Sequence, residues 1–116
     1  MKLMVLVLKK HEYLEQLLSE FLGAGLGGAT IIESVGMLRV IEQSRIEPPP
    51  IFGSLRQFIN PEYESSRTIF MVLEDEKIET ARNIINRIVG GLEKPNTGIL
   101  FTIPIDYVEG GVSESK

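Results

Sequence analysis

Residues 3–8 read Leu3-Met4-Val5-Leu6-Val7-Leu8, an apolar run that ends at two lysines, Lys9 and Lys10. A short continuous apolar run of this kind, bounded by polar residues, is typical of a strand that is buried on both faces. A second run, over residues 68–73, is rich in β-branched and aromatic residues. The two runs therefore predict two interior strands of one sheet.

Helical patterns and further strand-like segments follow each run. Apolar residues in 13–22 have the spacing i, i+1, i+4, i+5, and those in 78–88 repeat a helical spacing, with Asp75 expected as the N-cap of the second helix. Gly23 and Gly90 stand where these patterns stop, as helix-ending glycines do. Residues 29–35 and 99–105 then resume strand character. The order is strand, helix, strand, twice.

This order predicts an α+β fold of the ferredoxin-like βαββαβ type, a four-stranded antiparallel sheet with two helices on one face. A long loop, residues 37–66, joins the second and third strands; we call it the arm. Sheets with one wet face alternate apolar and polar residues, whereas residues 3–8 and 69–73 are apolar throughout. We therefore expect oligomerisation to cover the face without helices, since burial contributes about 25 cal/mol per Å² of apolar surface.

Composition is that of one ordinary domain spanning residues 1–116, with 43% hydrophobic residues, 24% charged residues and a net charge of −4. The absence of cysteine excludes disulfides, thiolate metal sites and cysteine nucleophiles. The acidic balance argues against nucleic acid as a partner, and no apolar stretch reaches transmembrane length. We expect a cytoplasmic protein without membrane insertion, with residues 110–116 as a mobile tail.

Three patterns that could carry chemistry have simpler structural interpretations. Residues 23–28 match G-x-G-x-x-G, but a helix precedes them and a strand follows, the reverse of a dinucleotide site, so they indicate a helix end and a turn. His11 is the only histidine, so no second histidine or cysteine completes a metal or catalytic site with it. The acidic residues in 74–79 match the dipole at a helix start. We expect no enzymatic activity and no metal site.

The segment from the second strand into the arm carries the most specific pattern. It reads Gly28-Ala29-Thr30-Ile31-Ile32-Glu33-Ser34-Val35-Gly36-Met37-Leu38-Arg39 and resembles the PII signal-transduction proteins, the nitrogen regulators. Residues 96–105 are similar to the B-loop and last strand of that family. The resemblance implies a homotrimer that binds an adenine nucleotide between subunits. It also implies that the arm, the family's T-loop, engages a transporter or enzyme target.

Site residues follow from the matching positions. The resemblance implies a nucleotide site made of Thr30, Gly36, Arg39, Lys94, Asn96, Thr97 and Gly98. Backbone N–H groups of a glycine-containing loop can bind an anion, and lysine and arginine side chains supply positive charge for phosphate. The chain departs from the family at Val40 and Ile99, which replace a glutamine and a lysine. A divergent sensor of AMP, ADP or a cyclic dinucleotide is therefore expected.

A trimeric metal-binding or scaffold protein, similar to the divalent-cation tolerance proteins, is the alternative. In that case His11 or the acidic residues in 74–79 would bind metal, or the arm would hold a partner. The arm contains three prolines at 48–50, followed by apolar residues spaced like a short helix. These apolar residues could dock on a partner or fold back onto a neighbouring subunit.

Overall fold

The computed structural model describes residues 1–37 and 66–111, so most of the arm and residues 112–116 of the predicted tail lie outside the described residues. Within the described residues, two α-helices, one 3-10 helix and four strands form an α+β arrangement, as predicted. In chain order the elements are β1 (Lys2–Leu8), the 3-10 helix η1 (His11–Tyr13), α1 (Leu14–Gly23), β2 (Ala29–Ser34), β3 (Ser66–Leu73), α3 (Asp75–Val89) and β4 (Gly98–Pro104).

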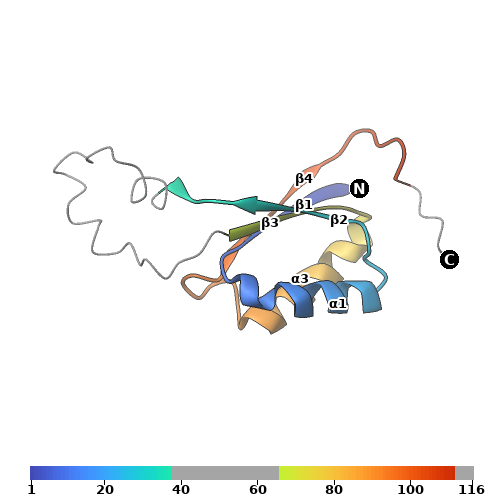
Figure 1. Cartoon of the computed structure of the whole chain (residues 1–116). Helices are drawn as coiled ribbons and strands as arrows, with labels where there is room; N and C mark the ends of the chain where they lie inside the picture. The colour runs from blue at the N-terminus through green and yellow to red at the C-terminus, as the bar shows by residue number, and fades with distance from the viewer. Residues whose placement is uncertain (38–65, 112–116) are drawn as a thin grey trace.

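The four strands form one antiparallel sheet in the order β2-β3-β1-β4. The two apolar runs of the sequence, β1 and β3, occupy its centre, while β2 and β4 are its edges. Figure 1 shows α1 and α3 side by side on the same side of the sheet. This confirms the predicted four-stranded antiparallel sheet with two helices, an arrangement compatible with a ferredoxin-like fold.

The core lies between the sheet and the helices. Alternate residues of β1 and β3 point toward α1 and α3, because successive side chains of a strand face opposite sides. Each helix contributes one apolar stripe, as its spacing predicts. The buried apolar side chains of this layer are Met4, Leu6, Leu8, Leu17, Phe21, Leu26, Ile69, Met71, Leu73, Ala81, Ile84, Ile85 and Val89.

Both helices end at the predicted glycines, but two details of the helices differ from expectation. α1 ends at Gly23, and the C-cap of α3 is Gly90 in the left-handed conformation, with φ 84°. Leu22 continues the apolar spacing of α1 yet is 68% exposed, because it lies at the edge of the stripe that faces the sheet.

The prediction that Asp75 is the N-cap of the second helix is wrong. The N-cap of α3 is Glu74, and no side chain makes a capping hydrogen bond there. Asp75 is the first helical residue, and its carboxylate lies 2.9 Å from the amino group of Met1. A negative charge in the first turn still complements the helix dipole.

The face of the sheet opposite the helices, called here the open face, is apolar. The strand register places Val5 of β1 between Phe70 of β3 and Phe101 of β4 on this face. No helix of residues 1–37 or 66–111 packs against it. Its apolar side chains with large exposed fractions are Ile32 (50%), Val72 (47%), Ile99 (59%), Phe101 (45%) and Ile103 (45%).

Candidate functional site

Most of the described residues of the predicted site lie at one end of the sheet, Gly36 after edge strand β2 and the loop at 94–98 before edge strand β4. β1 ends at Leu8, which pairs with Gly98 on one side and with Arg67 on the other. Immediately beyond, the backbone N–H of Lys9 donates to the carbonyl of Thr97 over 3.1 Å. The register of β2 brings its last residues, and hence Gly36, to the same end.

The loop between α3 and β4 is held by side chains from within it and from α3. The side-chain oxygen of Asn86 accepts from the backbone N–H of Leu92 over 2.8 Å. Thr97, only 5% exposed, has its hydroxyl within hydrogen-bonding distance of the carbonyls of Lys94, at 2.8 Å, and Leu92, at 3.3 Å. The Thr97 hydroxyl therefore supports the loop from inside.

Backbone geometry accounts for two further residues of the predicted site. Asn96 has a positive φ of 64°, a conformation that asparagine tolerates better than most residues. Gly98 has a φ of 152°, and a Cβ placed there would lie 2.4 Å from the carbonyl oxygen of Val7. Glycine at 98 thus allows β4 to approach β1. Lys94 is exposed on the same loop, and its ammonium nitrogen lies 3.8 Å from the position that a Cβ would have on Gly90, at the end of α3.

Lys9 connects the loop to Gly36, a role that sequence reasoning missed. Its ammonium nitrogen lies 4.0 Å from the position that a Cβ would have on Gly36. Lys9 therefore lies close both to Gly36, which follows β2, and to Thr97, in the loop before β4. The one feature of the sequence that could have indicated this role is the position of Lys9 directly after the apolar run of residues 3–8.

Thr30 lies away from this end of the sheet. It sits opposite Phe70 on the open face of β2, an edge strand, while the loop at residues 94–98 leads into β4 at the other edge. Three strand spacings separate these edges, about 14 Å in all. Within one chain Thr30 does not join the loop residues. Arg39, the remaining predicted site residue, lies outside the described residues.

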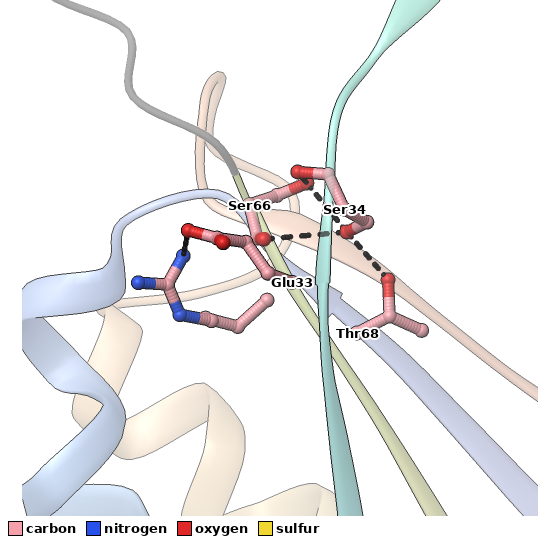
Figure 2. A network of polar contacts seen from close by, with 5 residues as sticks. Glu33, Ser34, Ser66 and Thr68 are labelled. Atoms are coloured by element: carbon pink, nitrogen blue, oxygen red, sulfur yellow. Dashed lines mark hydrogen bonds and ion pairs between the residues drawn. The ribbon is translucent and has the colours of Figure 1, made fainter.

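Polar side chains fasten β2 to β3 where the arm leaves the sheet; we call Ser34, Ser66 and Thr68 the neck cluster. The Ser34 hydroxyl lies 2.7 Å from the Thr68 hydroxyl and 3.0 Å from the Ser66 hydroxyl. Figure 2 shows these hydroxyls meeting between the two strands. Glu33 and Arg67, paired across the same strands, form an ion pair of 3.3 Å.

Two of the acidic residues in 74–79, Asp75 and Glu79, have partners of their own. The N-terminal amino group donates a hydrogen bond to Asp75 and lowers the pKa of that carboxyl, as does the charge of Lys2. The hydrogen bond and charge of Arg82 likewise lower the pKa of Glu79. In the part of the chain that the structure describes, no three histidine, cysteine, aspartate or glutamate side chains lie close enough to hold a metal ion.

Neither protein-family models nor curated proteins give a match to this sequence. Over residues 1–37 and 66–111, no helix is both long and apolar enough to cross a bilayer. The candidate site therefore rests on its own geometry: Gly36, Lys9 and the loop at 94–98 at one end of the sheet, next to an apolar open face.

Proposed function

We propose that this chain is a divergent PII-like signalling protein. It forms a homotrimer through the open face and binds an adenine nucleotide in the clefts between subunits. Through the arm it regulates a transporter or enzyme in the cytoplasm, without being an enzyme itself. The observation that carries this proposal is the open face, with its exposed apolar side chains on a sheet whose other face is already covered by helices.

The open face supports self-association on energetic grounds. Phe101 and Ile103 on β4 and Val72 on β3 each expose close to half of their surface. Burying them would contribute about 25 cal/mol per Å² of apolar area, which over several side chains is comparable to the net stability of a small domain. The trimeric state itself comes from the resemblance to the PII proteins.

An inter-subunit site also accounts for the separation of Thr30 from the loop. One chain would supply Gly36, Lys9 and the loop at 94–98, and a neighbouring chain would supply Thr30. Lys9 and Lys94 bring positive charge, and backbone N–H groups of the loop can bind phosphate oxygens. The departures at Val40 and Ile99 favour AMP, ADP or a cyclic dinucleotide over ATP with magnesium.

Calorimetry with AMP, ADP, ATP and cyclic dinucleotides tests this function directly. Divalent metals and 2-oxoglutarate complete the panel, and sedimentation equilibrium reports the mass of the assembly. Arg39→Ala and Lys94→Ala should each weaken nucleotide binding by roughly tenfold, the effect of one lost charge-assisted hydrogen bond. Lys77→Ala, a lysine on α3 at the other end of the sheet, is the matched control.

Two results would contradict the proposal. Affinity that is unchanged in both Arg39→Ala and Lys94→Ala would remove the assigned site. Binding of divalent metals without any nucleotide would instead support the metal-binding alternative.

A further inference from the structure

The edge strand β2 has little in its apolar pattern to set its register. Ile31 and Ile32 point to opposite faces of the sheet, and their exposed fractions are similar, 39% and 50%. A slip of one residue would exchange the two isoleucines, because every side chain then moves to the other face. Hydrophobic burial therefore distinguishes the two registers only weakly.

The hydrogen bonds of the neck cluster distinguish the two registers of β2 strongly. Ser66 is 6% exposed, and its hydroxyl donates to the carbonyl of Ser34 over 3.3 Å. The Ser34 hydroxyl donates to the carbonyl of Ser66, also over 3.3 Å, or bonds to the neighbouring hydroxyls. A slip of β2 would separate these partners and leave a buried hydroxyl unsatisfied, which is costly.

The opposite face of the same strands carries a second contact of this kind. Glu33 and Arg67 are directly opposed in the register, and their ion pair lies one position before the Ser34 and Ser66 pair. The Arg67 side chain is 24% exposed and the Glu33 side chain is 66% exposed, so the arginine is partly shielded from solvent while the carboxylate is not. The arm end of the described β2–β3 ladder is thus fastened by side chains on both faces.

Gly36 lies two residues beyond Ser34, so the register of β2 decides where it lies. One residue of slip moves a strand by about 3.4 Å. This shift is comparable to the 4.0 Å between the Lys9 ammonium and the Cβ position of Gly36. We propose that the neck cluster is a register lock that positions Gly36 against Lys9. Ser34, Ser66 and Thr68 are thus positioning residues of the nucleotide site, an assignment that rests on the proposed function for its ligand.

The test compares the wild-type chain with the double variant Ser34→Ala/Ser66→Ala. Nuclear magnetic resonance measures the cross-strand contacts of the pairs Ile32↔Thr68 and Thr30↔Phe70, and hydrogen exchange measures the protection of β2 amides. The double variant should lose or shift these contacts and exchange its β2 amides at least about tenfold faster, as expected for the loss of a hydrogen bond. Exchange in β1 should remain as in the wild type.

Two controls separate the lock from general destabilisation. Thr102→Ala removes an exposed hydroxyl from the other edge strand, β4, and should leave β2 unchanged. Ser34→Thr keeps the hydroxyl and should retain both the register and the exchange rates. A double variant with wild-type contacts and wild-type β2 exchange would overturn the register lock.

Nucleotide binding then separates this inference from the proposed function. If the wild-type chain binds a nucleotide, the double variant should bind it roughly tenfold more weakly while Ser34→Thr retains wild-type affinity. Unchanged affinity in a double variant whose register has shifted would overturn the positioning role. If the wild-type chain binds no nucleotide, the proposed function and the positioning role both fail, and contacts and exchange still decide the lock itself.

Discussion

Gly98 and Thr97, which the resemblance assigns to a ligand, also have structural roles inside the chain. Thr97 turns its hydroxyl toward the carbonyls of its own loop, and Gly98 lets the backbones of β4 and β1 approach. Under the proposed function, backbone groups of the loop and the side chain of Lys94 are therefore left to contact the nucleotide. At the scale of single residues, the candidate site depends on the hydroxyl contacts of Thr97 and on the close backbone approach at Gly98, which together hold the loop at 94–98 in place.

Gly98→Ala tests this close approach. A Cβ at this position would lie 2.4 Å from the Val7 carbonyl oxygen, and the φ of 152° is unfavourable for alanine. We expect a loss of about 1–3 kcal/mol in the free energy of unfolding, measured by urea denaturation. Gly28→Ala is the control, because nothing lies within 4 Å of its Cβ position, and it should change stability by less than about 0.5 kcal/mol. Equal stability of the two variants would contradict the packing described here.

At the scale of elements, α1 shows how a single apolar stripe joins a helix to the sheet. Leu17 and Phe21 are buried at 0% and 1% exposure, whereas Leu22 is 68% exposed despite its place in the apolar spacing. α1 is also joined to α3 by a bidentate ion pair in which Arg87 donates to both oxygens of Glu20, one of them at 3.0 Å. Burial and this charge pair act on the same helix contact.

Leu17→Ala and Leu22→Ala form a matched pair on α1. Leu17→Ala should lower the free energy of unfolding by about 2–5 kcal/mol, because it leaves a cavity in the core. Leu22→Ala should change it by less than about 0.5 kcal/mol, because the side chain is already in solvent. Chemical denaturation of both variants measures the difference. Similar losses would show that α1 packs on the sheet through a different stripe.

The ion pair between the helices predicts a pH dependence. The hydrogen bond from Arg87, and then its charge, lower the pKa of Glu20 below its ordinary value in the folded protein. The contribution of this ion pair to stability is therefore complete above the pKa that Glu20 has in the unfolded chain. It is lost as the pH falls through the lower pKa that Glu20 has in the folded protein. From about pH 5 to about pH 3, wild-type stability should fall more steeply than that of Glu20→Gln.

Arg87→Gln removes the partner of Glu20 and should make stability fall less steeply with pH, as Glu20→Gln does. Thermal unfolding across this pH range, at low salt where screening is weak, measures the three profiles. Parallel profiles for the wild type and both variants would show that the pair contributes nothing to stability.

At the scale of the whole molecule, the open face is the dominant feature. One face of the sheet is covered by α1 and α3, and the other exposes apolar side chains on β2, β3 and β4. The candidate site lies at one end of the same sheet, where β1 and β4 meet the loop at 94–98. A neighbouring copy that packs on the open face would therefore lie on the same sheet whose end carries the candidate site.

Phe101→Glu tests whether the open face is the contact between copies. A charge in the centre of an apolar interface is costly to bury, so this variant should sediment as a single chain at micromolar concentration. Leu22→Glu places the same charge on an exposed leucine of α1, away from the open face, and should keep the wild-type mass. A wild-type chain that is itself monomeric, or a Phe101→Glu variant of unchanged mass, would contradict assembly through this face.

Periodicity along the chain predicted the helices, the central strands and the apolar character of both sheet faces. These are local properties: a helix or strand that buries one side must repeat apolar residues with its own period. The glycines at which α1 and α3 end were equally visible. Gly90 takes the left-handed conformation, which few other residues accept, whereas Gly23 does not have a positive φ.

The candidate site was only partly visible in the sequence. Gly36 and the loop at 94–98 stood out through their resemblance to a known pattern, but the approach of Lys9 to Gly36 and the pairing of Ser34 with Ser66 did not. Ser34 and Ser66 are 32 residues apart along the chain. Contacts of this kind depend on which strands pair and in which register, and no local period encodes that choice. The sequence by itself determined the elements and their apolar faces, whereas the tertiary structure decided which polar residues meet at the end of the sheet.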